Sequence, residues 1–182
     1  MVASDARVLI LGSFPSEASL AARQYYAHPR NHFWPLLAAV LDEPLTMMAY
    51  PARLKRLKAR GVAVWDTIVA CTRAGSLDAA IRDAQRGDVD RIRMRAPCIR
   101  LVGFNGGTAF RAEDAWRAAG YATLALPSSS PAYTRPFAEK LAAWRAICAF
   151  LDPDPDWMLP PDIVIPGPQV MDSFKTRIAA KG

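Results

Sequence analysis

Four short polar motifs in this chain each follow directly on a run of apolar residues. They are Gly12-Ser13-Phe14-Pro15, Trp65-Asp66-Thr67, Phe104-Asn105-Gly106-Gly107 and Pro127-Ser128-Ser129-Ser130-Pro131. Serine, asparagine and aspartate bind and polarise substrates through hydrogen bonds. If the apolar runs are parallel strands, the motifs meet at the carboxyl edge of one sheet, where open α/β folds bind ligands. We therefore expect the functional site at this edge.

The pattern of the whole chain supports such a sheet. Strands are expected at 7–11, 62–65, 98–104 and 121–126, and helical spacing is found at 33–41, 52–60, 108–119 and 136–151. Ser76 is expected to cap a further helix through Ile81, and Asp88 one through Met94. Strands that alternate with helices predict a parallel sheet covered on both faces. The expected fold is a single-domain, three-layer α/β/α unit with a central four-stranded parallel sheet.

Length and composition indicate the number of domains and the kind of partner. A chain of 182 residues, 52% hydrophobic, suits one compact core. Six prolines crowd the segment after Leu151, which predicts a proline-rich C-terminal arm, 152–182, outside the α/β domain at 1–151. That domain holds 20 of the 23 basic residues and 12 of the 17 acidic ones, so its positive charge favours a polyanion such as nucleic acid.

Cysteine usage and hydropathy indicate the compartment. The three cysteines form no Cys-x-x-Cys pair, which is typical of a reducing compartment. No apolar run reaches membrane-spanning length, and no secretion signal is visible at the N-terminus. We expect a cytoplasmic monomer with no membrane association.

Several familiar chemistries are disfavoured. His28 and His32 have the spacing of a zinc-binding helix, but Pro29 stands where the general base would be. The serines of the fourth motif lack the glycines of a nucleophile elbow, and no phosphate loop or dinucleotide fingerprint is present. No lysine lies in the four motifs to form a Schiff base. We therefore expect no metal, no cofactor and no lyase step.

The order of these motifs carries a resemblance. Asn31-His32-Phe33-Trp34, Phe104-Asn105-Gly106 and Pro127-Ser128-Ser129-Ser130 resemble the uracil-DNA glycosylase superfamily, nearest its mismatch-directed thymine/uracil branch, over residues 7 to about 150. That branch carries an Asn or Asp after strand one to handle the hydrolytic water, and Phe14 stands there in this chain. Residues 11–20 and 25–31 are instead similar to the DNA-deoxyinosine (hypoxanthine-DNA) glycosylases, and this resemblance implies that the essential amide is Asn31.

The resemblance implies roles that compete with simpler structural ones. Asn31 would place the water and stabilise the sugar cation, whereas its residue type also suits the cap of the helix that follows. Asp66 would accept the N1–H of hypoxanthine, a proton that adenine lacks. Alternatively, Asp66 caps the following turn or pairs with Arg73. Asn105 either touches the base or holds the loop after Gly12 in place, and we favour the supporting role.

Further residues are expected to hold the base and the DNA. Gly12 and Ser13 would offer donors to the base, and Phe14, Tyr25 and Phe33 would stack on it. A loop is expected to contact phosphates or to push a wedge into the base stack, through Ser128, Ser129, Ser130, Pro131, Tyr133 and Arg135. Arg30 is expected to make a further phosphate contact. The alternative is an ordinary Ser/Pro turn ahead of the last helix.

The sequence therefore predicts a monofunctional DNA glycosylase that removes deaminated bases, hypoxanthine first and uracil or xanthine after it. Two other classes stay open at this point. One is a binding module on the glycosylase scaffold without catalytic activity, for which Phe14 is the best argument. The other is a small-molecule nucleoside hydrolase.

Overall fold

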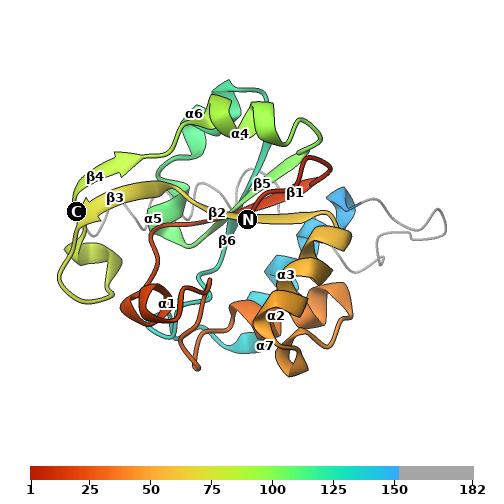
Figure 1. Ribbon diagram of the computed structural model, residues 1–182, viewed down its shortest axis with the longest axis horizontal. Coiled ribbons are helices and arrows are strands. Elements are labelled where there is room, and N and C mark those ends of the chain that lie inside the picture. The colour runs from red at the N-terminus through yellow and green to blue at the C-terminus, as the bar shows by residue number, and fades with distance from the viewer. Residues whose placement is uncertain (152–182) are drawn as a thin grey trace.

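A four-stranded parallel sheet forms the centre of the protein in the computed structural model, which describes residues 1–151. The strand order is β2-β1-β5-β6, with β1 at Val8–Gly12, β2 at Val62–Asp66, β5 at Leu101–Asn105 and β6 at Ala122–Leu126 (Figure 1). Gly12 pairs with Asp66, and Asn105 pairs with Leu126. All four strands therefore end at one edge, as the sequence predicts.

Helices cover both faces of this sheet (Figure 1). On one side lie α2 (Phe33–Leu41), α3 (Tyr50–Ala59) and α7 (Phe137–Trp144), and on the other α4 (Val89–Arg95), α5 (Gly107–Phe110) and α6 (Glu113–Ala118). Side chains of β1 alternate between two buried clusters, with Val8 and Ile10 in the first and Leu9 and Leu11 in the second. This alternation follows from the pleat of a strand that is buried on both faces.

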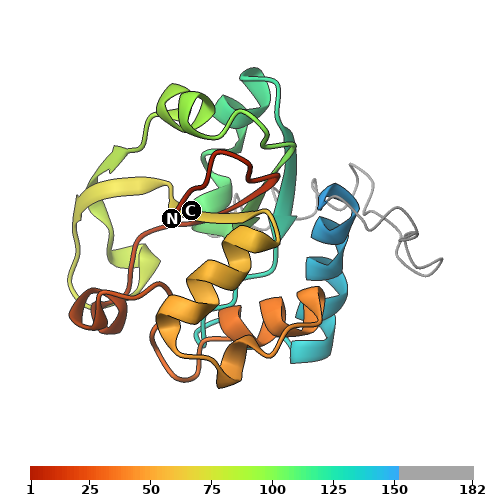
Figure 2. The same cartoon turned by 45° about the vertical axis from the view of Figure 1, so that its right-hand side comes forward.

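The first cluster contains most of the large side chains and fixes the helices beside the site. Phe33, Leu36 and Leu37 are fully buried on one side of α2, and Trp144 from α7 packs against Phe33. The two helices lie in contact, as the turned view also shows (Figure 2). The rigid core therefore extends to the start of α2, immediately after Asn31.

Three predicted helices differ from the structure. The predicted helix at 76–81 is wrong: an antiparallel pair, β3 (Ile68–Thr72) and β4 (Arg82–Arg86), flanks a short 3-10 turn at Asp78–Ala80. We call residues 68–86 the β3–β4 hairpin. The predicted helix at 108–119 is divided into α5 and α6, and that at 136–151 continues as a 3-10 helix over Arg145–Phe150.

Two smaller points complete the comparison. Helix α1 (Glu17–Ala22) was not anticipated, although Ser16 caps it by accepting from the N–H of Ser19. Asp88 caps α4 as predicted, by accepting from the N–H of Asp90. The predicted C-terminal arm, 152–182, lies outside the described residues.

Candidate active site

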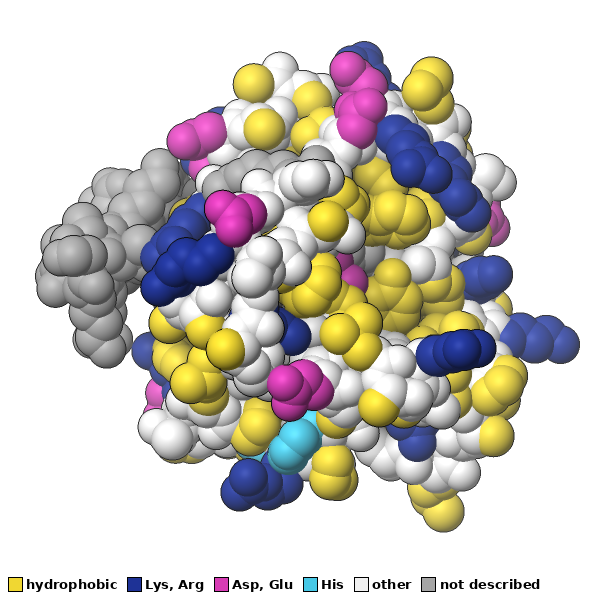
Figure 3. Space-filling model, turned by 60° about the vertical axis from the view of Figure 1, so that its left-hand side comes forward, with side chains coloured by type: hydrophobic (Ala, Val, Ile, Leu, Met, Phe, Trp, Pro, Cys, Tyr) yellow, Lys and Arg dark blue, Asp and Glu magenta, His cyan; other side chains and the backbone are white. Residues whose placement is uncertain are grey.

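A cavity of about 530 Å³ lies at the carboxyl edge of the sheet. This volume is within the usual range for small-ligand pockets. All four predicted motifs contribute to its lining, through Gly12, Asp66, Asn105 and Ser128 among others. The face that carries α1 and the β3–β4 hairpin is hollowed near its centre, and hydrophobic side chains gather around the hollow (Figure 3). The structure therefore has a cavity at the edge where the strand ends predict the functional site.

Gly12 makes room for two polar groups at the floor of the cavity. A Cβ atom at this position would lie 2.5 Å from Oδ1 of Asp66 and 2.8 Å from the hydroxyl of Tyr26. Because both distances are shorter than any van der Waals contact, only glycine allows the carboxylate and the phenol to approach the β1 backbone. Gly12 thus fixes the position of Asp66, and its own carbonyl accepts from the N–H of Thr67.

Burial raises the pKa of Asp66 from 3.8 to about 6, with the charge of Asp78 adding to the effect and the amino terminus of Met1 opposing it. The carboxylate is therefore mostly ionised at neutral pH and can only accept hydrogen bonds in that form. Arg73, the alternative partner, instead donates to the carbonyl of Pro15 and lies over the ring of Phe14, 5.0 Å from its centroid.

The position of Asn31 is compatible with both roles that the sequence left in competition. Its Oδ1 accepts from the N–H of Phe33 at 2.9 Å and so satisfies one donor at the start of α2, although the N-cap position itself is His32. The same residue lines the cavity. The hydrogen bond to Phe33 assigns the carbonyl end of the amide, which leaves the NH2 group as a donor.

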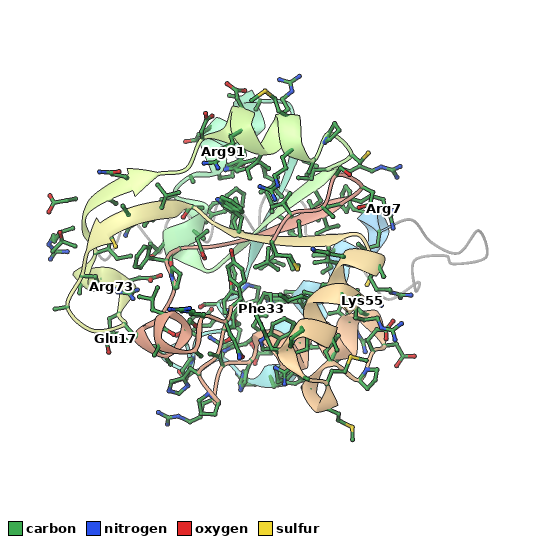
Figure 4. The ribbon with its side chains drawn as sticks, viewed as in Figure 1. Arg7, Glu17, Phe33, Lys55, Arg73 and Arg91 are labelled. Carbon is green, nitrogen blue, oxygen red and sulfur yellow. The ribbon has the colours of Figure 1, made fainter. Side chains whose placement is uncertain are left out.

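Phe33 does not line the cavity, which corrects its predicted role as a stacking surface. Its side chain is fully buried, and the ring of Tyr26 stacks on it at 3.7 Å between centroids and 13° between planes. Figure 4 places Phe33 on the α2 and α3 side of the sheet. Tyr26 lines the cavity in its place, together with the predicted Phe14 and Tyr25.

The Asn105 side chain holds a loop through both ends of its amide. Its Nδ2 donates to the hydroxyl of Ser129 at 2.8 Å, and its Oδ1 accepts from the N–H of Ser129 at 2.8 Å. Both residues are buried. The supporting role favoured from the sequence fits this geometry, although the loop that Asn105 holds is 127–135 and not the one after Gly12.

Further hydrogen bonds fix the same loop to the core. Trp144 donates to the carbonyl of Pro127 at 2.9 Å, and the buried Lys140 donates to the carbonyl of Tyr133 at 2.7 Å. The N–H of His32 donates to the carbonyl of Ser129 at 2.9 Å. A loop tied at several backbone atoms can present side chains in a defined position to a bound strand.

The predicted DNA-binding residues divide between the cavity wall and its surroundings. Ser128, Ser129, Ser130 and Tyr133 line the cavity. Pro131, Arg135 and Arg30 are not part of its lining: Pro131 and Arg30 are exposed, and Arg135 lies over the Tyr133 ring and pairs with Glu139 at 3.6 Å. Contact of these three residues with DNA stays a prediction.

The β3–β4 hairpin supplies a wall that the sequence analysis missed. Ser76, Leu77 and Asp78 line the cavity, and both Asp78 carboxylate oxygens lie 2.8 Å from the hydroxyl of Ser13. The hydroxyl donor of Ser13, which was predicted to serve the base, is therefore directed to Asp78. Arg73 from the same hairpin lies beside α1 (Figure 4).

Two further features concern metal ions and membranes. Among the described residues, no group of three His, Cys, Asp or Glu side chains is arranged to hold a metal ion. No helix within residues 1–151 has the length and apolar character needed to span a bilayer.

An open parallel sheet with a polar cavity at its carboxyl edge defines an α/β protein that binds its ligand between strand-end loops. The family model of the uracil DNA glycosylase superfamily matches residues 1–151, and the chain belongs to this superfamily.

Two relatives and one structure are similar over most of the chain. A hypoxanthine DNA glycosylase of Methanosarcina acetivorans is 39% identical over 143 residues, which cover 79% of this chain and 90% of that protein. One of Methanosarcina barkeri is 36% identical over 144 residues, covering 79% and 91%. A solution NMR structure from Methanosarcina acetivorans, provisionally described as a uracil DNA glycosylase, has a TM-score of 0.74 at 38% identity and covers 80% of this chain and 91% of that one.

Proposed function

We propose that this protein is a monofunctional DNA glycosylase that hydrolyses the bond between deoxyribose and a deaminated base, with hypoxanthine as the first substrate. It initiates base excision repair in the cytoplasm, acts as a monomer, and needs no metal or cofactor. Two relatives named hypoxanthine DNA glycosylases, each more than 35% identical, support the reaction class. The observation that carries the proposal is that Asn31 and Asp66 line one cavity at the strand ends.

The cavity offers the groups that the reaction needs. Cleavage of an N-glycosidic bond passes through a sugar with oxocarbenium character, while negative charge develops on the leaving base. The NH2 group of Asn31, whose Oδ1 is held by the N–H of Phe33, donates to the water and holds it beside the sugar. Asp66, ionised at neutral pH, accepts the N1–H of hypoxanthine. An adenine in the same position would present an acceptor to this acceptor, which disfavours it.

The surroundings of the cavity suit an extruded nucleotide. Phe14 and Tyr25 supply flat apolar surface for the base, and base stacking on an aromatic side chain contributes about 1–3 kcal/mol. The serines of the loop 127–135 lie at one wall, and Arg135 and Arg30 lie outside it for phosphates of the bound strand. Extrusion of a nucleotide costs a few kcal/mol and least at a poorly paired lesion, which favours damaged over normal sites.

The test uses a labelled duplex with a single deoxyinosine, incubated with the protein in EDTA and then treated with alkali to cleave abasic sites. We expect cleavage by the wild type and its loss in Asn31→Ala. Asn31→Asp separates the two functions of the amide, because aspartate still accepts from the N–H of Phe33 but has no NH2 donor. We expect Asn31→Asp to keep the stability of the wild type and to lose excision.

Gln85→Ala is the matched control, since Gln85 is an exposed carboxamide outside the cavity lining. Binding of the duplex without excision of any deaminated base would refute the proposal. Hydrolysis of free deoxyinosine but not of the duplex would refute DNA as the substrate.

A further inference from the structure

We infer that Asp78, on the β3–β4 hairpin, is the carboxylate that accepts a proton from the attacking water, in partnership with the hydroxyl of Ser13. This inference rests on the proposed glycosylase function and names a catalytic residue for it. Its basis is the geometry of the pair, in which both carboxylate oxygens of Asp78 lie 2.8 Å from the hydroxyl oxygen of Ser13 at the wall of the cavity.

The other polar side chains at the strand-end motifs have different partners. Asn105 exchanges two hydrogen bonds with Ser129, and Asn31 has its carbonyl oxygen on the N–H of Phe33. An amide is also too weak a base to take a proton at neutral pH. Asp66 has the base-reading role proposed above. Asp78 is the further carboxylate of the cavity lining, and its charge is close enough to raise the pKa of Asp66.

The hydrogen bond between Ser13 and Asp78 suits the pair to hold a water molecule. The Ser13 hydroxyl donates its single proton to Asp78, so its oxygen can only accept from any further partner. A water between the two residues can donate one proton to Asp78 and the other to the Ser13 oxygen. Both protons are then engaged, and a lone pair of the water is free to point toward the sugar.

The reaction step balances without another reagent. The bond between C1′ and N9 of hypoxanthine breaks, and its electron pair leaves with the base. The water oxygen forms a bond to C1′, one of its protons passes to Asp78, and the other remains on the new C1′ hydroxyl. The departing base takes a proton from solvent and Asp78 releases one to solvent, so the net change is addition of water across the C1′–N9 bond.

Three variants separate this role from a purely structural link between the hairpin and the β1 loop. Asp78→Asn keeps an oxygen that accepts from Ser13 but has no basic carboxylate. Ser13→Ala removes the link but keeps the carboxylate. Asp83→Asn is the matched control, because Asp83 is an exposed residue of the same hairpin with a φ of 51°, which asparagine tolerates.

The measurements are the single-turnover rate of hypoxanthine excision at saturating protein and the affinity for a duplex with a tetrahydrofuran abasic-site analogue. We expect Asp78→Asn to lower the rate by about 100-fold or more, the usual range for loss of a general base, with affinity within about threefold of wild type. Ser13→Ala should lose less rate than Asp78→Asn, and Asp83→Asn should match the wild type.

The opposite ranking overturns the inference. If the pair is only a structural link, Ser13→Ala loses more activity than Asp78→Asn, because asparagine preserves the hydrogen bond. A second readout covers the case in which Asp78→Asn folds poorly. Formate should restore part of the excision rate of Asp78→Ala, compared with chloride at equal ionic strength. Failure of this rescue counts against the inference. A wild type that excises no deaminated base overturns the proposed function, whereas wild-type excision with an undiminished Asp78→Asn overturns only the role of Asp78.

Discussion

Replacing Asp66 with asparagine is expected to stabilise the protein at neutral pH while it impairs the proposed reaction. Burial raises the pKa of this carboxyl from 3.8 to about 6, so the folded state favours the neutral form and ionisation opposes folding. At about 1.4 kcal/mol for each pKa unit, the difference corresponds to about 3 kcal/mol, and screening by solvent at this partly accessible group lowers the expected gain to about 1–3 kcal/mol. Asparagine has nearly the same shape and carries no charge.

The predicted stabilisation depends on pH. The folded-state pKa lies above the unfolded one, so the penalty from Asp66 is small below about pH 4, grows between about pH 4 and pH 6, and is complete above that window. The stability advantage of Asp66→Asn should follow the same course. Urea unfolding across this range measures it, with Asp5→Asn, an exposed aspartate ahead of β1, as the control that shows no such trend.

The same variant tests base reading. A hydrogen bond to a charged group contributes about 1.5–3 kcal/mol, which corresponds to about 10–150-fold in the rate of hypoxanthine excision. Asparagine can also turn its NH2 group toward N1 of adenine, so the preference for hypoxanthine over adenine should fall. An Asp66→Asn variant that is less stable than the wild type at neutral pH would refute the argument from burial, and one with unchanged base preference would refute the reading role.

Three other substitutions test residues in and around the cavity. Gly12→Ala places a methyl group 2.5 Å from the Asp66 carboxylate, and we expect a destabilisation of about 1–3 kcal/mol in urea with loss of excision; unchanged kinetics would contradict the close approach. Asn105→Ala leaves the buried N–H of Ser129 without its acceptor, which should cost about 1–3 kcal/mol by the same measurement and weaken DNA binding, and a neutral effect would exclude the loop-holding role. Arg135→Ala should reduce the slope of log affinity against log salt by about 1, and an unchanged slope would remove it from the phosphate contacts.

The sheet and the location of the site could be predicted because they depend on local signals. Each strand is a short apolar run, buried along its whole length in β1 and β5, and each polar motif follows a strand end. The parallel topology alone therefore brings Gly12 beside Asp66. Asn105 could be assigned a supporting role from its residue type, although its partner, Ser129, lies 24 residues further along the chain. Hydrogen bonds between residues so far apart depend on the path of the loops, which the spacing of residues along the sequence does not reveal.

The hairpin and the burial of Phe33 could not be predicted for related reasons. The residues of β4 are largely solvent-exposed, so Arg82–Arg86 lacks the apolar alternation that marks a half-buried strand. Without that strand, Asp78 had no predicted place near Ser13. Phe33 was expected in the cavity because it is an aromatic residue next to Asn31. The helical period instead places it with Leu36 and Leu37 on the buried side of α2, where Tyr26 covers it.

The charges of the cavity explain why a base enters it while the DNA backbone stays outside. Asp66 and Asp78 both line the cavity, and burial weakens the screening of charge around Asp66, so negative charge in the interior disfavours entry of a phosphate. An uncharged base meets no such barrier. Once the C1′–N9 bond stretches, positive charge develops on the sugar, and each carboxylate at about 5 Å stabilises it by about 3 kcal/mol at an effective dielectric constant of about 20. The ionised Asp66 carboxylate, which destabilises the empty site, therefore stabilises the transition state of the proposed reaction, and both effects have one physical cause, the incomplete solvation of its negative charge at the strand end.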